Sequence, residues 1–260
     1  MRPDEPPSAA SVDARTIAPE SLLMVRGLAA GYDGLPVVRD VTLHVDPGEV
    51  VTMLGPNGAG KTTTLATIAG SLAPISGDVE FLGASVGGVP AHRLAGRGVS
   101  LVPEGRALFF SLTVREHLKL AGGRHGLEQS QLFDLFPELE KCIDRKAGVL
   151  SGGEQQMLAV GRGIISRPKL LLVDEMSLGL APVIVERMLP VLRTIASEYG
   201  SGVLFVEQHV ALALEVADRA YVMNHGRIVL DGPAAELRGR QELLRASYLG
   251  ESAVAATAAE

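Results

Sequence analysis

The chain has 260 residues, of which 47% are hydrophobic and 21% charged, a composition that predicts an ordinary globular protein and excludes disorder as its main state. This length allows one large domain with a well-buried core, and a single catalytic domain is the simplest expectation. The formal net charge is -6, and because no run of lysine or arginine is present we exclude nucleic acid as the main partner.

The two ends of the chain differ in composition from the part between them. Residues 1–20 are rich in proline, alanine and serine, and half of residues 251–260 are alanine, so both are expected to be disordered tails. The single cysteine, Cys142, excludes an internal disulfide. Since no apolar run could span a bilayer and no signal peptide is evident, the chain is expected to stay in the cytoplasm.

Short apolar runs bounded by glycine, aspartate and proline begin the folded part, at residues 22–25, 41–45 and 50–54. This pattern is typical of strands joined by turns, and an antiparallel sheet is expected to open the fold. After Lys61 the apolar residues follow helical spacing, which predicts a helix packed on a core. They are Leu65, Ile68, Ala69 and Leu72.

A glycine-rich segment between the strand at 50–54 and this helix matches the phosphate-binding pattern G-x-x-x-x-G-K-[ST]. The residues assigned to the nucleotide here are Gly55, Pro56, Asn57, Gly58, Ala59, Gly60, Lys61, Thr62 and Thr63. Glycines let consecutive backbone N–H groups turn toward phosphate oxygens, and the helix N-terminus attracts the same charge. Lys61 is expected to hold the β- and γ-phosphates, and the Thr62 hydroxyl to bind Mg²⁺.

Residues from about 105 to 165 are more polar and mainly helical in pattern, which predicts a small helical subdomain inserted between strands. The apolar runs at 170–173 and 203–206 are continuous rather than alternating. Continuous runs are typical of parallel strands buried on both faces. The sequence therefore predicts an α/β fold in which strands and helices alternate around a parallel sheet.

Two adjacent carboxylates, Asp174 and Glu175, follow the run at 170–173. The carboxyl end of a parallel strand is the edge at which open α/β sheets bind ligands. Asp174 is expected to join the Mg²⁺ shell, and Glu175 to polarise a water for in-line attack on the γ-phosphorus. The alternative is that the two acids only make a strand end soluble.

A second anion site precedes another amphipathic helical pattern. Leu150 is followed by Ser151, Gly152 and Gly153, so a hydroxyl and free backbone N–H groups would meet at a helix N-terminus. A nucleotide needs one cradle, and the second site is therefore expected to close over the nucleotide of a partner subunit. An ordinary capped helix is the alternative for this motif taken alone.

In this order the three motifs resemble the ABC ATPase family, over residues 22–250. The resemblance implies a P-loop NTPase (RecA-like) core with an antiparallel β-subdomain and an inserted α-helical subdomain, in a nucleotide-binding domain at residues 21–250. It also implies that the chain binds ATP and Mg²⁺, hydrolyses ATP, and forms a head-to-tail dimer that drives a membrane permease.

Two other readings of the same motifs stay open. An ABC ATPase that acts on DNA ends or chromosomes would carry long coiled coils, whereas the interval between Lys61 and Asp174 has no sustained heptad repeat. A nucleotide sensor or translation factor of this family usually has two cradles in one chain, and one is found here. Stimulated ATP hydrolysis would distinguish an ATPase that drives transport from a nucleotide sensor.

The family pattern implies further assignments. Tyr32 lies where the family stacks an aromatic ring on adenine, with a surface-turn tyrosine as the alternative. Glu104 replaces the glutamine of the metal-sensing, permease-coupling loop, and its carboxylate offers an oxygen to Mg²⁺. Residues 177–181 resemble the loop that crosses the dimer interface, beside Met176 at the usual proline position.

The family's switch histidine, which contacts the γ-phosphate, aligns with Gln208, and His209 lies one position later. We assign the contact to Gln208, with a shifted switch at His209 as the alternative. A neutral amide can bridge phosphate and water but cannot carry a proton charge. Glu175 would therefore bear more of the chemistry.

These departures from the family pattern, together with the motif Tyr248, Leu249 and Gly250, look like the smaller ATPase of branched-chain amino acid uptake systems. Members of this group also serve urea and short-chain amides, and an ATPase contacts the permease rather than the solute. The implied partners are a second ABC ATPase subunit, integral membrane permease subunits and, indirectly, an extracytoplasmic solute-binding protein. The implied location is the cytoplasmic face of the inner membrane.

Overall fold

The computed structural model describes residues 21–122, 126–177, 179–240, 242 and 244. The two predicted tails, residues 1–20 and 251–260, and the motif at 248–250 lie outside the described residues. The described strands form two sheets. None of the described helices combines the length and the apolar character that crossing a bilayer requires.

The first sheet is antiparallel, with the strand order β2-β1-β4-β5. Its strands are β1 (Leu23–Tyr32), β2 (Leu35–Val45), β4 (Ser76–Phe81) and β5 (Ala84–Ser85). A two-residue turn joins β1 to β2, and Asp33 and Gly34 both have positive φ, 52° and 77°, as a tight hairpin turn requires. The runs predicted at 22–25 and 41–45 lie in β1 and β2, and both strands are longer than predicted.

The second sheet has the order β10-β9-β3-β8-β7-β6. Five strands are parallel, and β10 pairs antiparallel with β9. The strands are β3 (Val50–Leu54), β6 (Val99–Val102), β7 (Leu170–Val173), β8 (Gly202–Val206), β9 (Arg219–Asn224) and β10 (Arg227–Pro233). The expectation that 50–54 belongs to the antiparallel region is wrong, because β3 is buried on both faces and pairs in parallel with β8 and β9.

Side chains of the parallel strands alternate between two hydrophobic cores. In β7, Leu171 and Val173 face the core that the helices α3 to α9 share. Leu170 and Leu172 face the core that the antiparallel sheet and α1 share. Both faces of the strand are therefore apolar, which explains the continuous runs and confirms the predicted parallel sheet.

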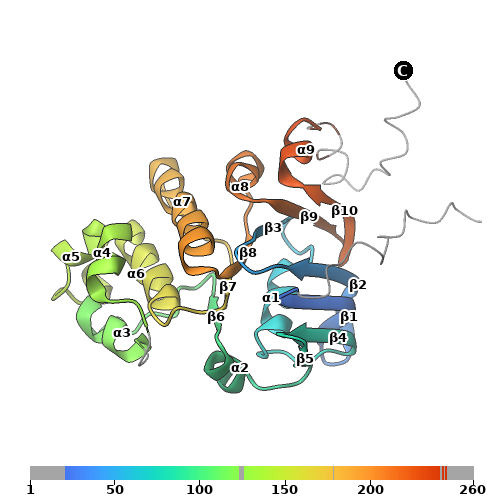
Figure 1. Cartoon of the computed structure of the whole chain (residues 1–260), viewed down its shortest axis with the longest axis horizontal. Coiled ribbons are helices and arrows are strands. Elements are labelled where there is room, and N and C mark those ends of the chain that lie inside the picture. The colour runs from blue at the N-terminus through green and yellow to red at the C-terminus, as the bar shows by residue number, and fades with distance from the viewer. Residues whose placement is uncertain (1–20, 123–125, 178, 241, 243, 245–260) are drawn as a thin grey trace, which may run out of the picture.

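The helices occupy the connections between strands. They are α1 (Lys61–Ile68), α2 (Ala91–Arg97), α3 (Val114–Ala121), α4 (Gln129–Leu135), α5 (Pro137–Lys141), the short 3-10 helix η1 (Ala147–Val149), α6 (Gly152–Ile164), α7 (Pro182–Tyr199), α8 (Val210–Val216) and α9 (Ala234–Arg238). Helices α3 to α6 gather at one end of the molecule and the antiparallel sheet lies at the other, with the parallel strands between them (Figure 1).

Helix α1 is shorter than the apolar spacing predicts, because it ends at Ile68 and leaves Leu72 outside. Gly70 follows the end of the helix with φ of 74°, a conformation that glycine adopts at little cost and that terminates helices. A side chain at this position would also collide with the backbone of Val89. The turn after α1 therefore begins earlier than predicted.

Candidate functional site

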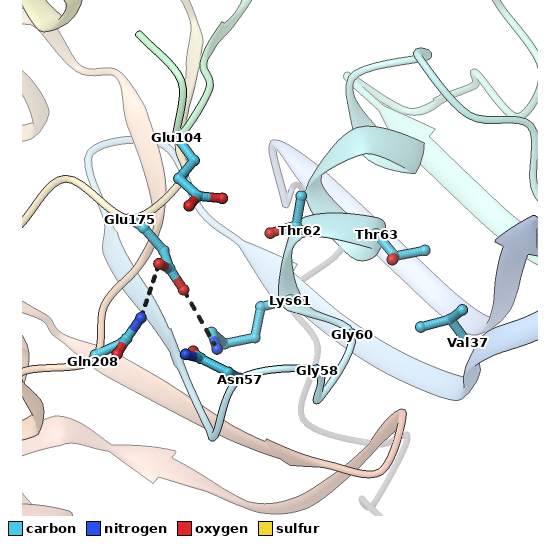
Figure 2. Close-up of a pocket in the computed structure, with 10 residues that line it drawn as sticks. All are labelled: Val37, Asn57, Gly58, Gly60, Lys61, Thr62, Thr63, Glu104, Glu175 and Gln208. Atoms are coloured by element: carbon cyan, nitrogen blue, oxygen red, sulfur yellow. Dashed lines mark hydrogen bonds and ion pairs between the residues drawn. The ribbon is translucent and has the colours of Figure 1, made fainter. Parts of the chain in front are cut away.

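The pocket lies at the carboxyl ends of the parallel strands. The glycine-rich loop follows β3, Glu104 follows β6, Asp174 and Glu175 follow β7, and Gln208 follows β8. This is the edge at which open α/β sheets bind ligands. The pocket has a volume of about 300 Å³. Its lining residues are Val37, Asn57, Gly58, Gly60, Lys61, Thr62, Thr63, Glu104, Glu175 and Gln208 (Figure 2).

The loop from residue 55 to 60 wraps the start of α1. Gly55 has φ of 150° and Gly60 has φ of 107°, and a side chain at Gly55 would collide with the backbone of Met223 in β9. Glycine is therefore required here both by conformation and by close packing. Because α1 begins directly at Lys61, its first N–H groups and its positive dipole end meet the pocket.

Lys61 is almost entirely buried, with 4% of its surface exposed. Its Nζ donates to the carbonyl oxygens of Gly55 at 2.9 Å and Pro56 at 3.0 Å, and it lies 3.8 Å from Oε1 of Glu175. Burial lowers the pKa of Lys61, while the carboxylate of Glu175 acts in the opposite direction. A buried ammonium group in the lining of this pocket suits the negative charge of a nucleotide.

Asp174 is not among the lining residues of the pocket but contacts one of them, Thr62. The Thr62 hydroxyl donates to Oδ1 of Asp174 at 3.2 Å. Burial is the main cause that raises the pKa of Asp174 to about 6; the hydrogen bond from Thr62 opposes this rise, and the carboxylates of Glu175 and Glu104 contribute to it. Mutually repelling carboxylates beside a hydroxyl form a hard-oxygen set that fits Mg²⁺.

Glu175 connects the pocket lysine to the segment after β8. Its Oε2 accepts a hydrogen bond from Nε2 of Gln208 at 2.9 Å, and both contacts of Glu175 are drawn in Figure 2. The backbone of Glu175 has φ of 46°, a sparsely populated conformation for a residue other than glycine. Such outliers concentrate at functional sites, where surrounding structure holds them in place.

Gln208 and His209 occupy different positions. Gln208 lines the pocket and contacts Glu175. His209 is not among the lining residues; it precedes α8, and its backbone N–H donates to Glu207 at 3.3 Å. This geometry favours Gln208 as the residue that meets a nucleotide.

The second anion motif lies outside the pocket of its own chain. Ser151 caps α6, where its hydroxyl accepts from the Glu154 N–H at 3.3 Å and its own N–H donates to the Glu154 carboxylate at 2.7 Å. Gly152 and Gly153 form the first turn. Tyr32 is also outside the lining, at the end of β1 and 54% exposed. The two predicted anion motifs therefore lie at the starts of two different helices, α1 and α6, and only the first lines the pocket.

Sequence reasoning missed two residues at or beside the pocket. Val37 of β2 forms an apolar part of the lining, and no motif marks it. Glu207 is fully buried directly after β8 and accepts hydrogen bonds from Ser177 and from the Gln208 N–H. An acid directly after a continuous apolar run was the available signal for Glu207.

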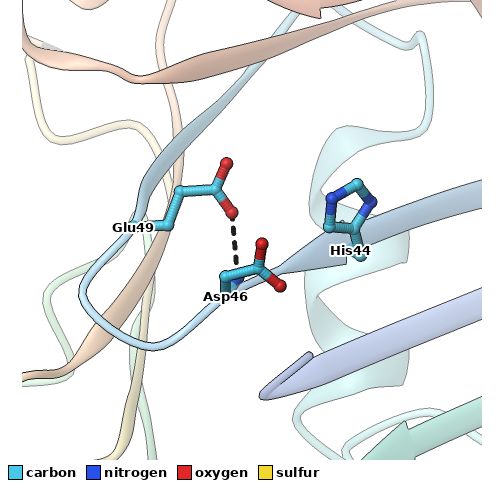
Figure 3. Close-up of side chains that lie close together, drawn as sticks. All are labelled: His44, Asp46 and Glu49. Carbon is cyan, nitrogen blue, oxygen red and sulfur yellow. Dashed lines mark hydrogen bonds between the residues drawn. The ribbon is translucent and has the colours of Figure 1, made fainter. Parts of the chain in front are cut away.

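A further group of possible metal ligands lies at the junction of the two sheets (Figure 3). Ligand atoms of His44, Asp46 and Glu49 lie within 4.8 Å of one another. The Glu49 carboxylate, however, accepts from Nε of Arg219 at 2.9 Å, and Nδ1 of His44 lies 3.2 Å from the Tyr221 hydroxyl. Because the arginine neutralises the acid, we interpret the group as a polar link between β2, β3 and β9.

The family model described as ABC transporter matches residues 38–177. The chain belongs to the ABC transporter family. It is 41% identical over 224 residues to the high-affinity branched-chain amino acid transport ATP-binding protein BraG of Pseudomonas aeruginosa, an alignment that covers 84% of this chain and 95% of that protein. It is 35% identical over 215 residues to the probable branched-chain amino acid transport ATP-binding protein LivF of Archaeoglobus fulgidus, covering 81% and 91%.

Among solved structures, an ATP-binding subunit of an ABC transporter superposes with a TM-score of 0.74 at 31% identity, covering 91% of this chain and 100% of that one. The predicted ABC ATPase fold is therefore confirmed. The chain is an ATP-binding, ATP-hydrolysing subunit of the ABC family. Cassettes of this family dimerise and work with membrane permease components.

Proposed function

We propose that this ABC ATPase powers an importer for branched-chain amino acids. The solute assignment rests on the similarity to BraG and LivF, whose names state this transport. Residues 21–250 form the nucleotide-binding domain, and residues from about 105 to 165 form its helical subdomain. The chain works as a peripheral protein at the cytoplasmic face of the inner membrane, bound to permease subunits that receive solute from an extracytoplasmic binding protein.

The pocket holds the triphosphate of ATP. Backbone N–H groups of the loop at 55–60 and of the first turn of α1, which includes Thr63, surround the phosphates. Lys61 neutralises the β- and γ-phosphates, which is supported by its buried Nζ. The exposed ring of Tyr32 stacks on the adenine.

Hydrolysis depends on the residues after β7 and β8. Glu175 accepts the proton of the attacking water, and Gln208, hydrogen-bonded to it at 2.9 Å, orients that water and the γ-phosphate. Thr62, Asp174 and Glu104 would hold Mg²⁺, which when bound neutralises charge on the phosphates. Because the neutral amide of Gln208 does not accept a proton, Glu175 is the residue of this pair that takes the proton from the water.

A second ABC ATPase subunit, identical or related, completes the site. Ser151, Gly152 and Gly153 start a helix whose N-terminal dipole end attracts anions. Since they lie outside the pocket of their own chain, we assign them to the γ-phosphate of the partner's nucleotide in a head-to-tail dimer. Each nucleotide is then enclosed by one cradle and one opposing helix.

Uptake by cells tests the solute. A strain that lacks only this chain should lose high-affinity uptake of labelled leucine, and the natural gene should restore it. The Glu175→Gln variant should not, because it removes the proposed proton acceptor. Labelled urea serves as the comparison solute. If leucine uptake persists in the deletion strain while urea or amide uptake falls to background, this ATPase drives transport of a different solute.

The two candidate switch residues give opposite predictions. Gln208→Ala should lower ATP turnover by about ten- to a thousandfold with little change in ATP affinity, because one preorganised donor is lost. His209→Ala should have a much smaller effect. Steady-state ATPase of both variants should be followed from about pH 5.5 to 8.5, since a catalytic histidine would impose an inflection near about 6.5. If His209→Ala is the inactive variant and this inflection disappears with it, the switch is His209.

A further inference from the structure

Glu207 is a buried carboxylate that the proposed reaction does not use. It follows β8 and has 0% of its surface exposed. Its Oε1 accepts from the Ser177 N–H at 3.0 Å, and its Oε2 accepts from the Ser177 hydroxyl at 2.6 Å. Oε2 also accepts from the backbone N–H groups of Gln208 at 2.9 Å and His209 at 3.3 Å.

Neutral donors rather than a cation surround this acid. Among the ion pairs of the described residues, none involves Glu207. Burying a carboxylate is costly unless hydrogen bonds replace its water. Four donors converge on the two oxygens, and bonds to a charged acceptor are stronger than bonds between neutral groups. The carboxylate therefore holds in place the backbone of the residues that donate to it, which are Ser177, Gln208 and His209.

The donors come from two segments that leave neighbouring strands. Strands β7 and β8 are paired in parallel, with Val173 opposite Phe205. Ser177 lies two residues beyond Glu175, and Gln208 lies one residue beyond Glu207. Glu207 thus ties together the two segments whose side chains meet in the Glu175–Gln208 hydrogen bond.

We propose that Glu207 is a positioning residue that holds Glu175 and Gln208 in register for attack on the γ-phosphate. The proposal rests on the catalytic roles proposed above for these two residues. Glu207 touches no nucleotide; it sets where Ser177 and the Gln208 backbone lie, and through them the distance between the water-activating carboxylate and the amide. A small displacement of a reacting group lowers a rate by up to about 100-fold without weakening substrate binding.

Glu207→Gln is the most informative substitution because it keeps the shape of the side chain. The amide places an N–H group where one carboxylate oxygen accepts, so at least one of the four donors loses its acceptor and faces another donor. In the full-length chain we expect kcat for ATP to fall about ten- to a hundredfold. The KM and the nucleotide affinity should stay within about twofold, because Lys61 and the loop are unchanged.

A matched control separates positioning from general stability. Glu49 also accepts from a backbone N–H and is not among the residues that line the pocket. Glu49→Gln is expected to lower the melting temperature and leave kcat unchanged.

Combining Glu207→Gln with Gln208→Ala should slow turnover by less than the product of the two single effects, because Glu207 acts in part through Gln208. Fully multiplicative effects, or an unchanged kcat in folded Glu207→Gln, would overturn the proposal.

If Glu207→Gln does not fold, Ser177→Ala carries the test, since it removes the hydroxyl donor and leaves the acid. A several-fold lower kcat at unchanged KM supports positioning, and an unchanged kcat overturns it. The Glu175→Gln variant in the same series separates a failure of the catalytic assignment from a failure of the positioning role. If Glu175→Gln turns over normally, the catalytic assignment fails. If it is inactive while Glu207→Gln turns over normally, only the positioning role of Glu207 fails.

Discussion

Glu175→Gln is expected to bind ATP about as tightly as the natural chain and to hydrolyse it at least about 100-fold more slowly. The amide retains an oxygen that accepts from Gln208, whose Nε2 lies 2.9 Å from the natural carboxylate. It cannot accept a proton from the attacking water. Because the phosphates then remain intact between two subunits, the dimer should persist, and size-exclusion chromatography with Mg-ATP should show a doubled mass.

Glu215→Gln is the matched control for this experiment, since Glu215 is an exposed acid on α8 outside the pocket lining. It should hydrolyse ATP at the natural rate and show no stable doubled mass. A Glu175→Gln variant that stays monomeric with Mg-ATP and turns over at the natural rate would remove Glu175 from the proposed role.

Lys61→Ala is expected to weaken ATP binding by about 10- to 100-fold, because the β- and γ-phosphates lose a charged hydrogen-bond donor. The effect should be large since Nζ is buried and already directed at the loop, where it donates to the carbonyls of Gly55 and Pro56. Calorimetric titration with ATP measures the affinity. Lys119→Ala, an exposed substitution on α3, should bind ATP normally.

Loss of Lys61 also releases those two carbonyl groups, so the melting temperature of Lys61→Ala should be measured beside its affinity. A folded variant with natural nucleotide affinity would show that Lys61 does not neutralise the phosphates. A folded variant that binds ATP weakly supports the assigned role.

The strands that could be predicted from sequence are those with both faces buried. Residues 50–54 and 170–173 were predicted with the bounds of β3 and β7, because Gly55 ends the first apolar stretch and Asp174 ends the second. In β1, by contrast, Gly27 and Gly31 interrupt the apolar pattern, and the pairing with β2 shifts register between Val25 and Leu28. Such irregular pairing depends on the neighbouring strand, and the single sequence predicts only the first part of β1.

The same distinction holds in the pocket. Lys61, Thr62, Asp174 and Glu175 are recognisable because each belongs to a local motif at the end of a buried strand or the start of a helix. Glu207 also follows a buried strand, β8, but its sequence position does not indicate which groups it contacts. Its role depends on donors carried by the segment after β7 as well as by its own, and only folding brings these segments into contact.

Each central strand directs alternate side chains into two different hydrophobic cores. The helical part and the antiparallel-sheet part of the molecule are therefore packed on the same strands. Leu171 and Val173 of β7 pack with the helices, and Leu170 and Leu172 of the same strand pack with the antiparallel sheet. Opening either core would displace a backbone that the other core needs. Unfolding of the described sheets is therefore expected to be cooperative, so that the nucleotide pocket at their carboxyl edge is lost or kept as a whole.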